Sequence, residues 1–206
     1  MRLCVRVFGW SQGRFLRHCA AAVAALVVAA SCHADGVRDI AEKAMRKALS
    51  SSAAWKMERT LPGAKNVLAS SGTVVCHVGE EGIEWRTIEP FGALVAMKKD
   101  AMVFEDEDGR REKPAADMPR YSDIRKATDA FAKGEKTAFD DVFEVKVESL
   151  GEGRWKAVFV PRNSMLRGLV EKLSVEGAEL LEKAELKSGN GTVSRITFEE
   201  MKGDAK

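Results

Sequence analysis

Cys76 and His77 are the most reactive side chains downstream of residue 34, and they are neighbours in the sequence. A thiol beside an imidazole is the pairing from which cysteine nucleophiles are built. The segment 70–90 predicts two strands around a tight turn, and consecutive side chains of a strand point to opposite faces. Cys76 and His77 therefore cannot meet each other. We expect a small buried thiol and a solvated imidazole.

The acidic run Glu105–Asp108, followed by Gly109, is the segment that most resembles a calcium loop. The EF-hand pattern would require an acid at position 104 and a glutamate at position 115, where the chain has Phe104 and Ala115. A single His and a single Cys after residue 34 do not make a zinc site. We therefore predict a charged hairpin tip, and neither a metal nor a cofactor.

Glycine-rich phosphate loops are also missing from the sequence. No GxxxxGK[ST] segment is present, and no GxGxxG opens a predicted helix. With no catalytic pair, metal set or phosphate loop, we predict that the protein is not an enzyme.

Residues 1–34 have the pattern of a cleaved signal peptide. A leader with four arginines and no acid precedes the apolar run at 19–30, which is shorter than a membrane span. Small residues at Cys32 and Ala34 predict cleavage before Asp35 and a periplasmic protein. A retained membrane anchor is one alternative. Lipidation of Cys32 is another, although the preceding Ala29-Ala30-Ser31 lacks a large aliphatic residue.

Residues 35–206 are predicted to form a single domain. Cleavage would remove four of the 33 basic residues and none of the 31 acidic ones, which leaves 29 against 31. This near-neutral balance gives no electrostatic argument for nucleic acid. Cys76 would be the one remaining cysteine, so packing rather than a disulfide must stabilise the chain.

The hydrophobic periodicity predicts an α+β fold. Apolar residues recur at three- and four-residue steps over 37–48, and again over 122–133 after a candidate N-cap at Ser122, which predicts two helices. The remaining segments alternate with a period of two and are separated by turn residues. We expect about ten to eleven strands in a curled, incompletely closed antiparallel β-barrel. Its strands lie near 55–61, 72–78, 82–88, 91–99, 101–106, 143–148, 155–159, 169–177, 179–188 and 192–200.

The alternation also predicts which side chains share the inner face of the sheet. These are the apolar residues Trp55, Met57, Val74, Val78, Ile83, Trp85, Phe104, Trp155 and Phe159. The charged residues between them should face solvent, namely Lys56, Glu58, Glu84, Arg86 and Lys156.

Arg59 breaks this pattern, because it falls on the same face as Trp55, Met57 and Leu61. An unpaired buried guanidinium is costly, so Arg59 must reach a carboxylate or the rim of the sheet. Two interpretations remain open, a structural ion pair at the rim and a cation that meets the polar head of a ligand.

The order of these motifs resembles the outer-membrane lipoprotein carrier protein (LolA) family, and in particular its divergent LolA-like branch. The residues that carry the resemblance are "WKMERTLPGAKNVLASSGTVVCHVGEEGIEWRTIEP", "GEKTAFDDVFEVKVE", "GRWKAVFVPRNSMLRGLVEKLSV" and "GNGTVSRITF". With the first helix they cover nearly all of 35–206.

The resemblance implies a monomeric periplasmic carrier. Helices would cover the concave face of its half-barrel, and the inner residues with Arg59 would line a cavity for the acyl chains of a lipoprotein. An inner-membrane donor transporter and an outer-membrane acceptor are implied as partners. Gly79 stands near the position where such carriers have a cavity arginine, so a glycolipid or another lipid stays open as cargo. The alternative is a lipid- or peptide-sensing domain, or an enzyme, on the same shell.

Overall fold

The computed structural model describes residues 36–77, 82–118, 121–133, 135 and 139–203. The predicted signal peptide, Val78 and Gly79 lie outside these residues. The elements follow in the order α2 (Val37–Ala48), β1 (Ser51–Thr60), β2 (Val67–His77), β3 (Gly82–Glu89), β4 (Ala93–Met97), β5 (Ala101–Asp106), β6 (Gly109–Pro114), the short 3₁₀ turn η1 (Ala115–Asp117), α3 (Tyr121–Ala132), β7 (Phe143–Gly151), β8 (Arg154–Pro161), α4 (Ser164–Arg167), β9 (Lys172–Gly177), β10 (Leu181–Lys187) and β11 (Val193–Gly203).

The strands form one antiparallel sheet of eleven strands in the order β6-β5-β4-β3-β2-β1-β11-β10-β9-β8-β7. It consists of two meanders, β1–β6 and β7–β11, which are joined because the first strand pairs with the last. The sheet is not closed, because β6 and β7 are its two edges. The predicted α+β class and incompletely closed antiparallel sheet are therefore confirmed.

The hairpins lie where the turn residues predict them. β2 pairs with β3 across 78–81, β5 pairs with β6 beside Gly109, and β7 pairs with β8 around Gly151 and Gly153. β1 differs from the prediction, since it begins at Ser51, only two residues after Leu49, the C-cap of α2. Serine disfavours helix but is compatible with a strand whose neighbours supply both hydrogen-bond ladders.

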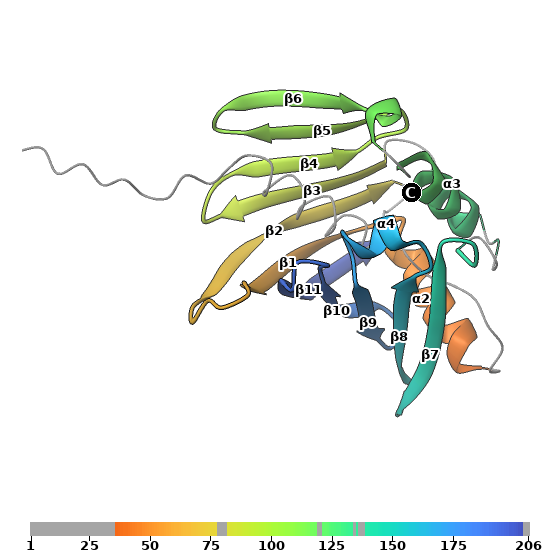
Figure 1. The fold of residues 1–206 in the computed structure, drawn as a ribbon. Coiled ribbons are helices and arrows are strands. Elements are labelled where there is room, and N and C mark those ends of the chain that lie inside the picture. Colours follow the sequence, from red (N-terminus) through yellow and green to blue (C-terminus); the bar gives the residue numbers. More distant parts are fainter. Residues whose placement is uncertain (1–35, 78–81, 119–120, 134, 136–138, 204–206) are drawn as a thin grey trace, which may run out of the picture.

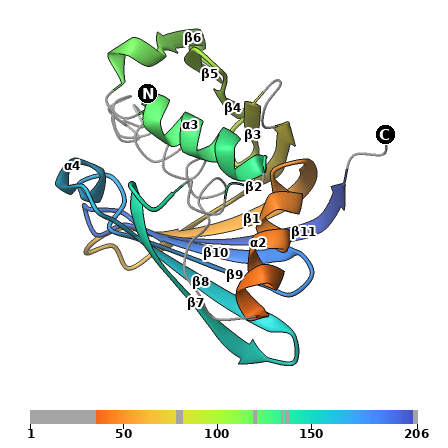
Figure 2. The same ribbon diagram turned by 90° about the vertical axis from the view of Figure 1, so that its right-hand side faces the viewer.

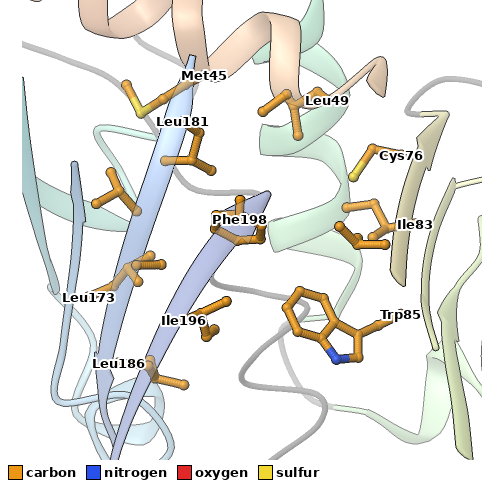
Figure 3. Close-up of a cluster of buried hydrophobic side chains, with 14 of the residues drawn as sticks. Met45, Leu49, Cys76, Ile83, Trp85, Leu173, Leu181, Leu186, Ile196 and Phe198 are labelled. Carbon is orange, nitrogen blue, oxygen red and sulfur yellow. The ribbon is translucent and has the colours of Figure 1, made fainter. Parts of the chain in front are cut away.

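The sheet curls so that its inner side chains converge from both wings. β3 and β11 are three strand steps apart, about 14 Å in a flat sheet. The ring centroids of Trp85 on β3 and Phe198 on β11 are only 6.4 Å apart. Figure 3 shows Trp85 and Ile83 pointing toward Ile196 and Phe198, with Met45 and Leu49 above them.

The two longer helices lie at the same end of the strands (Figures 1 and 2). α2 contacts β7, β8, β1, β10 and β11 through a face of small side chains, Ala41, Ala44 and Ala48, with Met45 beside them. The same face carries a buried ion pair, in which Arg38 Nε lies 2.7 Å from Glu42 Oε1. The small side chains let the helix approach the sheet closely.

α3 is attached to the turn between β4 and β5 by polar contacts. The Tyr121 hydroxyl reaches the carbonyl oxygens of Lys98 and Ala101, the latter at 3.0 Å. Buried Arg125 places Nη1 3.5 Å from the carbonyl oxygen of Met97, and its Nε lies 3.2 Å from Asp129 Oδ1. α3 begins at Tyr121, so Ser122 lies within the helix and is not its N-cap; an N-cap at Ser122 would have set the first helical residue at Asp123, two residues later.

The contacts that attach α3 include Tyr121, the sole tyrosine of the chain, and its ionisation makes the attachment depend on pH. Burial raises the pKa of Tyr121 from 10.0 to about 12, with Asp100 and Asp129 adding to the rise and Arg125 opposing it. Tyr121 therefore ionises at a lower pH in the unfolded chain than in the folded protein. Its contribution to the free energy of unfolding is complete below pH 10 and should be lost as the pH rises toward 12. We expect tyrosinate absorbance to appear near pH 12 in the folded protein and near pH 10 in urea.

Tyr121→Phe provides the control for this titration. The variant should flatten the decline in unfolding free energy over that pH range, while the lysines continue to titrate in both proteins. Tyrosinate formation near pH 10 in the folded protein would contradict the buried, hydrogen-bonded phenol.

Candidate functional site

The inner face of the sheet is a continuous apolar surface. All the described members of the predicted inner set except Arg59 are buried, and they belong to one hydrophobic cluster. Lys56, Glu58 and Arg86 are exposed, while Glu84 and Lys156 are partly exposed, so the predicted strand registers are confirmed. Whether this surface binds a ligand stays a prediction.

Cross-strand rows show how the registers bring the predicted residues together. One row runs Phe104, Val95, Trp85, Val74 and Ala53 across β5, β4, β3, β2 and β1. A second row runs Phe159, Leu173, Leu186, Ser194, Arg59 and Leu68 across β8, β9, β10, β11, β1 and β2. The two rows lie on the same face because each strand alternates with a period of two.

Two tryptophans each cover a glycine on the neighbouring strand. Trp55 is paired with Gly72, and Trp155 is paired with Gly177. A Cβ atom added to Gly72 would lie 2.8 Å from Trp55 Cζ2 and 1.9 Å from the carbonyl oxygen of Arg86. A Cβ added to Gly177 would likewise lie 3.0 Å from Trp155 Cζ2. The glycines therefore make room for the indole rings on the inner face.

The buried indoles differ in their hydrogen bonds. Trp155 Nε1 donates to the carbonyl oxygen of Ala178 at 2.7 Å. Trp55 is 1% exposed and stacks on Trp85 with a centroid separation of 4.6 Å, and its Nε1 has no hydrogen-bond partner among the described residues. A buried donor without an acceptor costs about 1–3 kcal/mol. The interior thus contains a polar group that an acceptor on a ligand would satisfy.

Arg59 lies near the end of β1, on the inner face, as its place in the alternation predicts. Its side chain is half-buried; Nε donates to Ser194 Oγ at 3.3 Å, and Nη2 lies 3.6 Å from Met57 Sδ. Leu61 was expected on this face too, but it follows the last residue of β1 and is exposed. Arg59 therefore lies at the edge of the apolar interior, next to the connection between β1 and β2.

Several interior residues were not among those predicted from the sequence. They are Phe139, Phe143, Phe198, Leu173 and Ile196. Phe143 contacts both Phe139 and Phe159 edge to face, with centroid separations of 6.4 Å. Phe143, Leu173, Ile196 and Phe198 continue the alternation of their strands, so the same signal would have found them. Phe139 precedes β7 and carries no such signal.

The outer face of the central strands forms an open groove of about 1060 Å³. Charged side chains of both signs line it, and they pair across strands: Lys56 with Glu199, Lys156 with Glu176 and Arg195 with Glu185, each at 2.8–2.9 Å. The hydrogen bond that Lys156 Nζ donates to the Glu176 carboxylate raises the pKa of Lys156. Met57 is the only member of the predicted inner set among the lining residues. This charged groove is chemically unlike a site for an acyl chain.

The described residues contain no group of His, Cys, Asp and Glu side chains that is placed to hold a metal ion. Cys76 is buried and His77 is half-buried, on opposite faces of β2, so they do not form a catalytic pair. Within the same described ranges, no helix has both the length and the apolar character of a membrane span.

No family profile and no curated protein matches this sequence. Several solved structures are similar to this chain, all at low identity. A LolA superfamily protein from Nitrosomonas europaea is 12% identical, with 84% of this chain and 96% of that chain covered and a TM-score of 0.41. LprF from Mycobacterium bovis is 11% identical, with 82% and 94% covered and a TM-score of 0.41. The MucA/MucB complex from Pseudomonas aeruginosa is 10% identical, with 84% of this chain and 59% of that chain covered and a TM-score of 0.42.

Gly72→Ala tests the packing of the indole against the sheet. The added methyl group would overlap the backbone of β3, which cannot move without breaking the ladder, so we expect a loss of about 1–3 kcal/mol in unfolding free energy. Gly92→Ala is the matched control, because a Cβ there meets nothing within 4 Å. Chemical denaturation of both variants measures the difference. Equal stability of the two would contradict the close approach of Trp55 to Gly72.

Proposed function

We propose that the protein is a non-catalytic carrier that binds the acyl chains of a lipoprotein or another lipid against the inner face of its curled sheet. The observation that supports this most directly is the continuous apolar inner face of a sheet whose two edge strands do not meet. Because the wings are not hydrogen-bonded to each other, they can separate without breaking a strand pair. α2 and α3 would act as covers at one end.

Acyl-chain burial supplies enough free energy for such a role. Each buried CH₂ group contributes about 0.8 kcal/mol, so a long chain needs only partial burial to bind tightly. The side chains of the inner face pack against one another, as the contact of Trp85 with Phe198 shows. A ligand would therefore enter by displacing these contacts, and the net gain would be smaller than the gross burial.

Two polar groups would orient the ligand. Trp55 Nε1 is a buried donor that would bond to an ester or carboxyl oxygen. Arg59 stands at the loop end of the same face, where it would meet a polar or anionic head. In this proposal the acyl chain extends along the inner face and the head remains near Arg59. Transport through a periplasm, with a donor and an acceptor at its two membranes, is the wider role that the sequence resemblance implies.

Lipid binding is tested directly by native mass spectrometry of the purified protein and by titration with a fluorescent fatty-acid probe. We expect co-purified acylated species and saturable probe binding. Trp55→Phe should weaken binding of the probe about 5- to 10-fold because it removes the N–H donor, whereas Lys56→Gln on the outer face should not change binding.

Probe transfer between donor and acceptor vesicles then separates a carrier from a sensing domain, which would retain its ligand. A protein that binds no probe would refute the proposal.

Arg59→Leu decides between the two interpretations of Arg59. If Arg59 orients a ligand head, the variant should fold with unchanged stability, hold an apolar probe more tightly and release it more slowly. If Arg59 is half of a structural ion pair, the variant should lose roughly 3–5 kcal/mol where the partner is buried, with no change in probe handling. A thermal melt and a probe-release assay on this variant measure both outcomes.

A further inference from the structure

The two free edges of the sheet differ in how well they are protected against pairing with another strand. β6 is short, consists mostly of charged residues and ends at Pro114, all of which discourage pairing. β7 spans nine residues from Phe143 to Gly151 without a proline, and it forms the border of the sheet in Figure 2. Its free side therefore presents a long row of backbone N–H and C=O groups that another strand could bind.

The hydrogen bonds to β8 show which residues of β7 direct their backbone groups to the free side. The backbone N–H of Arg162 donates to the carbonyl oxygen of Val142 at 2.9 Å, and the β7–β8 ladder has no register shift as far as residue 149. Because antiparallel hydrogen bonds alternate residue by residue, the even-numbered residues of 144–148 bond to β8. The residues whose backbone groups face away from the sheet are Val145, Val147 and Ser149.

A second copy of the chain fits this edge when the two β7 strands run antiparallel about Val147. That register places Val147 opposite itself and Val145 opposite Ser149, and each of these pairs exchanges two backbone hydrogen bonds. Val145 is buried and Val147 packs against the hydrophobic cluster of the inner face. Pairing would therefore extend the apolar inner face across the seam between the two copies.

The charges of β7 favour this register. On the outer face Lys146 would lie opposite Glu148 of the second copy, and two-fold symmetry repeats the pair. Glu148 is already opposite Lys156, which is itself opposite Glu176. This row of alternating charge would continue with Lys146 of the second copy. The Lys146 side chain is 80% exposed, so it can turn toward the seam although its Nζ lies 3.3 Å from Glu144 Oε1.

The remaining charges near the seam lie at its edges. Glu144 would face Leu150 of the second copy, which is exposed and carries no charge. At each end, residues 140–142 with Arg162 would approach the turn 151–154 of the second copy, which sets three acids against two arginines. These groups lie beyond the last hydrogen-bonded pair, so their weak repulsion is smaller than the attraction inside the ladder.

From the free edge, the direction of its backbone groups and its alternating charges, we propose that the protein forms a two-fold symmetric dimer through antiparallel pairing of β7 with β7 of a second copy. One continuous sheet would result, with the apolar inner faces of both copies on the same side. The proposal does not depend on lipid binding. It differs from the monomer that the sequence resemblance implies, and measurements of association decide between the two.

Charge reversal tests the pairing by sedimentation velocity over a concentration series. The parent should dimerise, whereas Lys146→Glu and Glu148→Lys should each weaken association by about tenfold or more, because each sets like charges opposite each other twice. An equimolar mixture of the two variants should form a heterodimer, since each supplies the charge that the other lacks. Lys113→Glu, on the other edge strand, is the matched control and should associate as the parent does.

Val147→Cys tests the register. It would place two thiols opposite each other at the two-fold axis, with Cα atoms about 5.5 Å apart, a separation that a disulfide spans. Mild oxidation should therefore give more covalent dimer than the parent, whose own cysteines set the background. Ser149→Cys is the matched control and should give no increase, because Val145 of the second copy would lie opposite it.

Two results would overturn the proposal. One is a parent that stays monomeric throughout the concentration series. The other is a dimer that both charge-reversal variants form as strongly as the parent, because association would then use another surface. Unfolding cannot imitate the expected result, since heterodimer formation in the mixture requires that both variants are folded. All variants share the N-terminus of the parent, so residues 1–34 contribute equally.

Discussion

The pairing of the first strand with the last is the constraint on which the architecture depends. β1 lies antiparallel to β11, with Trp55 opposite Phe198 and Met57 opposite Ile196. Without this ladder the chain would consist of two separate meanders, each with one uncovered apolar face. With it, both meanders contribute to one inner surface, and the remaining free edges are β6 and β7. Contacts between the two ends of the chain are costly in loop-closure entropy, and the buried Trp55 and Phe198 help to offset that cost.

Curvature follows from what the strands carry on their two faces. Bulky rings on the inner face need space, and Gly72 and Gly177 provide it beneath Trp55 and Trp155. The outer face carries cross-strand ion pairs such as Lys56 with Glu199, whose long side chains remain partly hydrated. These exposed pairs contribute little stability individually, but they oppose a one-residue slip of register, because a slip would bury charges and expose rings.

Much of this arrangement could be predicted from the sequence, because the period-two alternation specifies burial residue by residue. Trp155 and Lys156 illustrate it: one is fully buried and the other faces the outer groove. The position of α3 could not be predicted, since it depends on Tyr121 and Arg125 finding carbonyl groups more than twenty residues away. The early start of β1 at Ser51 was also missed, because local serine propensity is outweighed by pairing with β2 and β11.

The close packing of the interior has a consequence for the affinity of any ligand that would bind there. An acyl chain gains the burial of its own CH₂ groups but replaces contacts such as Trp55 with Trp85, so only the difference between the two appears as affinity. In a rigid open cavity nearly all of the burial would count toward binding, and release would be slow. In a sheet that repacks behind the departing ligand, closure of the inner face offsets part of the cost of dissociation. A carrier must release what it binds, and the stacked indoles therefore suit a role in which moderate affinity is required.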